Sequence, residues 1–201
     1  MKRKLRYFRQ HTLETCGISC ILMILDYFHR IQYPTEKQER KLYSLYRCRS
    51  FCGVHAASAA ECLSKNRLSV ALYHSSPRGL ENRDNYFPEA LFCAIFDEYQ
   101  AALDRAGDRI HVEYGVDLTP KWLQAQMASG KLAMLQCIVP GDADGLHDHV
   151  LHWILCYGCR DKEFMICDPI PQSGKLVLSE AELTHYMDTP IGKCAVVVSG
   201  D

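Results

Sequence analysis

Residues 18–28, with the sequence ISCILMILDYF, are apolar on almost every side. A helix of this composition has no face suited to water, so the segment predicts a helix buried within the core rather than one lying on its surface. Thr15 stands where the N-cap of this helix would fall, which places Cys16 in the first turn. The apolar run is far too short to span a bilayer.

The remaining sequence patterns change in character along the chain, from mainly helical to mainly strand-like. The expected helices cover residues 35–49, 56–66, 89–106 and 120–129, and a capping box at Ser179 and Glu182 opens one more. The expected strands cover residues 68–73, 132–139, 150–157, 163–167, 175–178 and 194–199, and residues 75–88 are expected to form a long loop. Because the regular alternation of a doubly wound sheet is missing, we predict an α+β fold. Residues 1–201 would form a single domain, with a helical N-terminal part followed by a C-terminal antiparallel sheet.

The charge balance argues against one large class of function. The 201 residues carry 23 Lys and Arg against 24 Asp and Glu, for a formal net charge of −1. A nucleic-acid-binding protein driven by its overall field would be basic, so no nucleic acid partner is predicted. The basic residues of segment 2–9 are expected to form a solvated tail.

The cysteine content is high, with 11 cysteines at irregular spacings. A chain of this length can bury a core without covalent staples, and the number is odd, so disulfides are not expected. We predict a cytoplasmic location with no signal peptide and no membrane span, although export by a signal-independent route stays open. Most of these cysteines are then small apolar core residues, and one of them can be a nucleophile.

Cys16 has the local setting that a thiol nucleophile needs. The N-terminus of a helix favours a thiolate through its N–H groups and the positive end of the helix dipole. Gly17 follows it and would let a substrate backbone come close. Gln10 stands six residues earlier and offers an amide that can stabilise an oxyanion. Cys20 lies one turn further into the apolar segment and is expected to be inert.

His152 and Asp168 are the candidates for the base and its orienting carboxylate. His152 begins the strand-like segment 152–157, and Asp168 follows the next such segment, 163–167. In a hairpin that turns near Asp161, both side chains would lie near the same open end. There the carboxylate can accept a hydrogen bond from the imidazole and fix its tautomer.

Together these motifs resemble the C39 peptidases, papain-like cysteine proteases best known as the leader-cleaving domains of bacteriocin exporters. The resemblance rests on Gln10, on Cys16 followed by glycine and an apolar helix, on the strand from His152, and on Asp168 followed by proline. It implies a papain-like fold in which Cys16 is the nucleophile and His152 the base. It also implies that Asp168 orients the base and that Gln10 is the oxyanion-hole donor.

Two further expectations follow from the resemblance. Cys16 and His152 are further apart in this chain than in the compact family core, and the extra length fits an insertion at residues 75–114. The expected substrate contacts are Gly17, Trp153 and His149.

Two segments have the residue types of a metal site. Segment 147–152 contains three histidines and an aspartate, and segment 48–55 contains two cysteines and a histidine. Both lack a second pair at zinc-like spacing, so no metal and no other cofactor is predicted. The histidines are assigned to a loop that faces the substrate or supports the residues that do, and the cysteines are assigned to the core.

The sequence therefore predicts a cysteine-dependent hydrolase, a peptidase or amidase. It would act through an acyl-Cys16 intermediate on a peptide or on an acyl- or aminoacyl-bearing substrate, carrier-bound or free. An acyl, aminoacyl or peptidyl transferase would use the same residues, with an amine or a thiol in place of water. A non-catalytic binding module that keeps the cleft is the third interpretation, and it predicts that Cys16 is no more reactive than an ordinary thiol.

Overall fold

The computed structural model describes residues 4–140, 149–170 and 174–200, without the side chains of residues 140 and 149. The helices are α1 (Cys16–Tyr27), α2 (Glu36–Tyr46), α3 (Ala56–Lys65), α4 (Glu89–Ala106), α5 (Pro120–Ala128) and α6 (Glu180–Met187), with 3₁₀ turns η1 (Arg83–Asn85) and η2 (Gly107–Arg109). The strands are β1 (Ser69–His74), β2 (Ile110–Glu113), β3 (Leu132–Pro140), β4 (His149–Arg160), β5 (Glu163–Asp168), β6 (Gly174–Leu178) and β7 (Cys194–Ser199).

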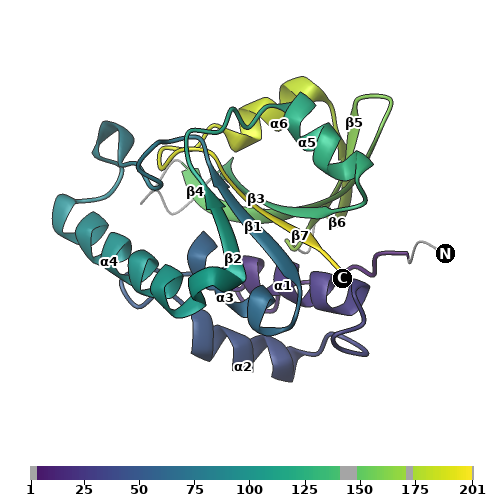
Figure 1. Cartoon of the computed structure of the whole chain (residues 1–201), viewed down its shortest axis with the longest axis horizontal. Coiled ribbons are helices and arrows are strands. Elements are labelled where there is room, and N and C mark those ends of the chain that lie inside the picture. Colours follow the sequence, from purple (N-terminus) through teal and green to yellow (C-terminus); the bar gives the residue numbers. More distant parts are fainter. Residues whose placement is uncertain (1–3, 141–148, 171–173, 201) are drawn as a thin grey trace.

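The strands form one seven-stranded sheet with helices on both faces (Figure 1). The strand order is β2-β1-β7-β3-β4-β5-β6. Strands β1 and β2 run parallel, whereas every other neighbouring pair is antiparallel. The predicted α+β class is confirmed, and the expected hairpin between β4 and β5 turns at Asp161 and Lys162, which both adopt positive φ.

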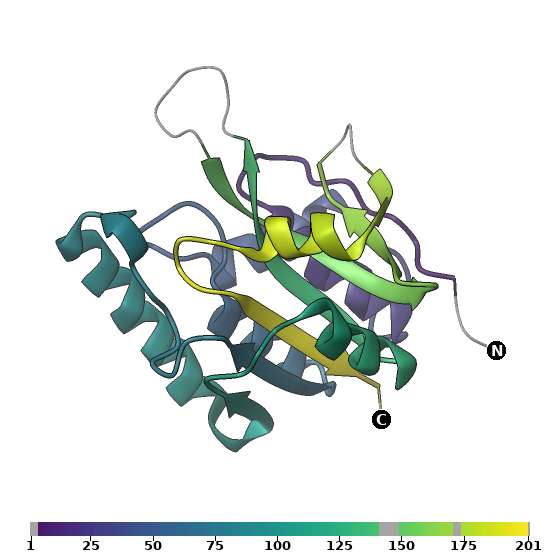
Figure 2. The same ribbon diagram turned by 90° about the horizontal axis from the view of Figure 1, so that it is seen from above.

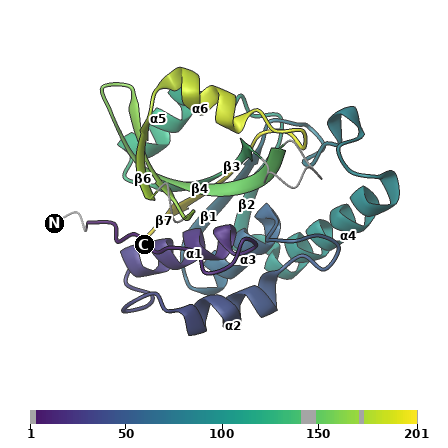
Figure 3. The same ribbon diagram turned by 180° about the vertical axis from the view of Figure 1, so that it is seen from behind.

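Helices α1 and α3 pack against one face of the sheet, α1 on β3 and β4 and α3 on β1 and β7 (Figure 3). Every residue of α1 from Cys16 to Asp26 is buried, as an all-round apolar sequence requires. Helix α3 contains four alanines, whose short side chains allow α4 to pack closely against the side of α3 that faces away from the sheet. Helices α5 and α6 cover the opposite face, as the view from above shows (Figure 2).

Strand β2 is not among the predicted strands. It has only four residues and lies between Gly107 and Gly115, so it is too short to show a clear alternation of apolar and polar residues. Its parallel pairing with β1 also departs from the expected wholly antiparallel sheet. Strand β2 and helix α4 both belong to segment 75–114, the expected insertion.

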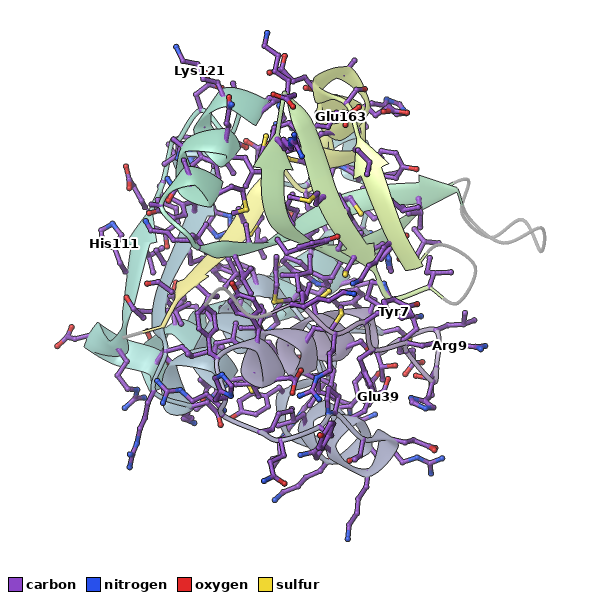
Figure 4. The ribbon with its side chains drawn as sticks, turned by 90° about the vertical axis from the view of Figure 1, so that its right-hand side faces the viewer. Tyr7, Arg9, Glu39, His111, Lys121 and Glu163 are labelled. Atoms are coloured by element: carbon purple, nitrogen blue, oxygen red, sulfur yellow. The ribbon has the colours of Figure 1, made fainter. Side chains whose placement is uncertain are left out.

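The N-terminal segment is not a solvated tail from residue 5 onward, so that expectation is wrong there. Leu5 is buried, and Arg6 pairs with the buried Asp26 near the end of α1, with 2.7 Å between Arg6 Nε and Asp26 Oδ2. Figure 4 shows Tyr7 at the boundary between the helical layer and the sheet. The segment therefore follows the seam between these two layers and leads into the site.

All eleven cysteines lie in the described part of the chain as free thiols, eight of them buried. Within the described residues, no helix combines the length and the apolar character needed to cross a membrane.

Candidate active site

Cys16 is the first residue of α1 and is buried. Thr15 occupies the N-cap position, but its hydroxyl donates to the carbonyl of Thr12 (3.0 Å) and does not cap the helix. The first N–H groups of α1 therefore remain available to other acceptors. The main-chain N–H groups of Gly17 and of Trp153 on β4 lower the pKa of the Cys16 thiol.

The position of Trp153 in the sheet explains why its main-chain groups can interact with the cysteine side chains of α1. The pairing of β4 with β5 ends at Leu155 and Cys167, two residues beyond Trp153. The polar main-chain groups on that side of Trp153 therefore face α1. Its carbonyl accepts from the Cys20 thiol (3.6 Å), one helical turn below Cys16. Helix α1 is thus bonded through Cys20 to the part of β4 that is paired with β3 but not with β5.

His152 and Asp168 meet as the hairpin geometry predicted. His152 Nε2 lies 2.8 Å from Asp168 Oδ1, and both side chains are buried. Asp168 is itself held in place, because the same oxygen accepts from the main-chain N–H of Ile170 (2.9 Å). His152 also interacts with Cys16, and this interaction lowers the pKa of the thiol and raises the pKa of the imidazole. The structure therefore brings Cys16, His152 and Asp168 into one chain of contacts.

Gln10 is fixed to the turn that follows Asp168. Its main-chain N–H donates to the carbonyl of Pro169 (3.0 Å), and the Tyr7 hydroxyl donates to the carbonyl of Ile170 (3.1 Å). The buried Gln10 side chain donates from Nε2 to the carbonyl of Thr12 (3.0 Å). A side-chain amide carries two N–H donors, so one donor of Gln10 remains for another acceptor. Its Oε1 is the one buried side-chain N or O atom of the described residues that lacks a partner.

The electrostatics of the site favour a thiolate–imidazolium pair. Burial by itself raises the pKa of Cys16, but the charge and hydrogen bond of His152 outweigh it. With the N–H groups of Trp153 and Gly17, they bring the pKa below its ordinary value. Burial likewise lowers the pKa of His152, and its contacts with Cys16 and Asp168 overcome this effect and raise the pKa. Both shifts stabilise the charged form of each partner.

Cys16 differs in this respect from its neighbours in the core. Burial raises the pKa well above its ordinary value at Cys20, which agrees with the expectation that Cys20 is inert. Burial is also the largest cause of a raised pKa at Cys48, Cys62, Cys137, Cys156, Cys159, Cys167 and Cys194. At Cys52, the largest cause is a hydrogen bond to Glu14.

Gly17 and Trp153, two of the expected substrate contacts, touch one another. A Cβ atom at Gly17 would lie 3.0 Å from Trp153 Cδ1 and 3.3 Å from Val54 Cβ. The missing side chain therefore makes room for the Trp153 ring, whose Nε1–H donates to the carbonyl of Val54 (2.8 Å). This packing gives Gly17 a reason to be glycine that the sequence did not reveal.

The sulfur lies at a cleft of about 550 Å³ between the helical layer and the sheet. One wall comes from segments 10–16 and 51–54, and the other comes from β3, β4 and Ile170. A larger hollow of about 810 Å³ lies between α4 and the loop before it, but no histidine is among its lining residues. The smaller cleft is the candidate site because it holds the activated thiol.

The other candidate residues lie in the two segments that have the residue types of a metal site. His149 is the first residue of β4, and its side chain lies outside the described residues, as do residues 147 and 148. In segment 48–55, His55 caps α3 by accepting from the N–H of Ser58, and Cys48 is buried as expected, whereas Cys52 is exposed, so its assignment to the core is wrong. The described residues contain no group of three or more His, Cys, Asp or Glu side chains arranged to hold a metal ion.

Sequence reasoning missed several residues that line the cleft. Phe51 and Val54 reach it from an irregular stretch before α3, where no sequence period marks them. Gln136 reaches it from β3, and here a signal existed. It is the one strongly polar residue within the otherwise apolar run 132–139.

The packing of α1 and α3 against the mainly antiparallel sheet is a papain-like fold. No family model and no curated protein matches the sequence. Among solved structures, the chain is similar to the peptidase domain of Streptococcus ComA, a bifunctional ABC transporter involved in a quorum-sensing pathway. That match has 11% identity and a TM-score of 0.52, and it covers 98% of this chain and 100% of that chain.

The chain is also similar to a double glycine motif protease from an AMS/PCAT transporter, solved in complex with the leader peptide. The identity is 14% and the TM-score 0.50, over 97% of this chain and 91% of that chain. These likenesses confirm the predicted C39-like, papain-like fold. At such low identity they show the fold alone, so the roles of individual residues rest on the geometry described above.

Proposed function

We propose that this protein is a cysteine-dependent hydrolase, a peptidase or amidase, that works through an acyl-Cys16 intermediate. The observation that carries the proposal is the charged pair of Cys16 and His152 at the cleft, with Asp168 bound to the far side of the imidazole. A thiol with a lowered pKa at a helix N-terminus is the usual arrangement of a cysteine nucleophile.

In the first step, the Cys16 thiolate attacks the substrate carbonyl carbon and forms a tetrahedral intermediate with a negatively charged oxygen. The second N–H of the Gln10 amide and the main-chain N–H of Cys16 stabilise this oxyanion. The intermediate collapses as the bond to the leaving group breaks, and His152 gives its proton to the departing amine or alcohol. Cys16 then carries the acyl group as a thioester.

In the second step, the neutral His152 removes a proton from water, which attacks the thioester carbonyl. Collapse of the second tetrahedral intermediate releases a carboxylic acid, and the Cys16 thiolate and the His152 imidazolium are restored. An amine in place of water would give an amide product, so the same residues would then act as a transferase.

The cleft suits an uncharged, partly apolar peptide segment. Its rim exposes Leu13 (83% exposed) and Val150 (45% exposed), and the lining contains no Lys or Arg among the described residues. Large exposed apolar side chains at a cleft are typical of a binding surface. We therefore propose a peptide-like substrate, and the leader peptide bound by one structural neighbour is consistent with that class.

The proposal is tested with a chromogenic ester, N-benzyloxycarbonyl-glycine p-nitrophenyl ester, on the wild-type protein and the variants Cys16→Ala and His152→Ala. Both variants should lose the p-nitrophenol burst while keeping the circular dichroism spectrum of the fold. Adding glycinamide separates the two chemistries, because a transferase would divert most of the acyl group to the amine. Retention of turnover in Cys16→Ala would eliminate the mechanism.

We also propose a reducing compartment such as the cytoplasm. All eleven cysteines are free thiols, and the proposed nucleophile acts only when reduced.

A further inference from the structure

Gln136 is a polar residue at an unusual place. It lies on β3 between Leu135 and Cys137, both fully buried, and pairs across the sheet with Trp153, the residue after His152. Gln136 is 4% exposed, yet it lines the cleft that contains Cys16. An apolar residue would serve the core better at this position, so the amide calls for an explanation.

The amide of Gln136 makes no hydrogen bond within the part of the chain that the structure describes. Of the other buried polar side chains of the site, His152 is engaged with Asp168, and Gln10 is engaged through Nε2 but not through Oε1. Gln136 has no side-chain N or O atom that is both fully buried and unpartnered, so its amide still reaches the cleft, where a ligand can supply the missing hydrogen-bond partner.

The chemistry of that partner follows from the amide and its surroundings. A glutamine side chain offers N–H donors and a carbonyl acceptor with no charge, which matches a peptide group better than a carboxylate or an ammonium group. The carboxylate of the cleft, Glu14, belongs to the opposite wall and is already bound by the Tyr43 hydroxyl. Apart from His152, the sheet wall beside Gln136 carries no charged side chain among the described residues, and it has one open amide.

We propose that Gln136 hydrogen-bonds a backbone amide in the acyl part of the substrate, and this inference rests on the proposed function. The acyl part is the relevant one because it stays in the cleft through both chemical steps, whereas the leaving group departs after the first. Gln136 is thus a specificity-determining residue. It selects peptidyl or N-acyl-aminoacyl groups over simple acyl chains that carry no amide.

The test compares two esters with the same leaving group. p-Nitrophenyl acetate has no amide in its acyl part, whereas N-benzyloxycarbonyl-glycine p-nitrophenyl ester has one next to the reacting carbonyl. The measured quantity is the ratio of kcat/KM for the second ester to kcat/KM for the first. In the variant Gln136→Met, which keeps the side-chain length but removes the amide, we expect this ratio to fall about 10-fold for a lost hydrogen bond.

Two further variants serve as controls for this comparison. Gln124→Leu changes an exposed glutamine on α5, which packs on the other face of the sheet, and should keep the wild-type ratio. Gln136→Asn keeps an amide but shortens its reach by one methylene, so its ratio should also fall, and it covers the case in which Gln136→Met does not fold. A general loss of structure would reduce turnover of both esters together and leave the ratio unchanged.

The outcomes separate the two proposals. A wild-type ratio near one, or an unchanged ratio in folded Gln136 variants, overturns the role of Gln136 while leaving the hydrolase intact. Failure of either ester to acylate wild-type Cys16 refutes the hydrolase and, with it, the role of Gln136. A ratio that falls in both Gln136 variants and holds in Gln124→Leu supports the inference.

Discussion

The substitution Asp168→Asn tests how the site activates its sulfur. The carboxylate accepts from His152 Nε2 at 2.8 Å in a buried environment, and this contact is one cause of the raised pKa of the imidazole. An asparagine keeps the shape and an acceptor oxygen but removes the negative charge. The imidazolium form of His152 then becomes less favourable. Because the imidazolium stabilises the Cys16 thiolate, the thiolate also becomes less favourable.

The size of this effect can be worked out from the contact that is lost. A hydrogen bond to a charged group contributes about 1.5–3 kcal/mol, and a pKa shift of one unit corresponds to roughly 1.4 kcal/mol. The charged pair should therefore weaken by about one to two pKa units. The pKa of Cys16, which is lowered in the wild type, moves up toward its ordinary value of 9.0.

The assay is the rate of Cys16 alkylation by iodoacetamide, followed by mass spectrometry between pH 4 and pH 9. Below the thiol pKa the rate follows the thiolate fraction, so Asp168→Asn should slow alkylation by about 10- to 100-fold at any pH below the wild-type thiol pKa, and by less at higher pH. Asp161→Asn is the matched control, since Asp161 lies in the exposed β4–β5 turn at a positive φ that asparagine accepts. If the pH at which the alkylation rate falls on the acid side is the same in Asp168→Asn as in the wild type, the reasoning is refuted.

Three further substitutions test the packing around the site. Arg6→Ala removes a charged partner of buried Asp26 and should lower the urea midpoint of unfolding, so an unchanged midpoint would contradict this. Gly17→Ala places a methyl group against the Trp153 ring, so it should lower the free energy of unfolding by about 1–3 kcal/mol and change the tryptophan fluorescence spectrum. An unchanged spectrum together with an unchanged melting temperature would contradict this prediction. Cys20→Ala should leave the alkylation rate of Cys16 within about threefold of wild type, and a larger loss would mean that Cys20 takes part in the chemistry.

The sequence predicted the parts of this fold that local patterns encode. The all-round apolar segment identified α1, and the strand-like runs identified every strand except β2. The pairing of His152 with Asp168 followed from a hairpin, because two strands joined by a short turn fix which of their ends meet.

Contacts between distant segments were beyond local patterns. The ion pair between Arg6 and Asp26 depends on where the N-terminal segment crosses α1, and no spacing rule reveals that crossing. The same holds for Gly17, whose role depends on the Trp153 ring from β4. Gln136 could have been noticed as a polar residue in an apolar strand, but its place in the cleft required the register of β3 with β4.

The central claim is that Cys16 carries the acyl group, and one measurement tests it directly. The protein is mixed with N-benzyloxycarbonyl-glycine p-nitrophenyl ester, quenched in acid and digested, and the modified peptide is fragmented to distinguish Cys16 from Cys20, because both lie in the same tryptic peptide. We predict one acyl group on Cys16 in the wild-type protein and none in Cys16→Ala. Acylation of Cys20 or of another residue, or turnover that persists in Cys16→Ala, would contradict the account.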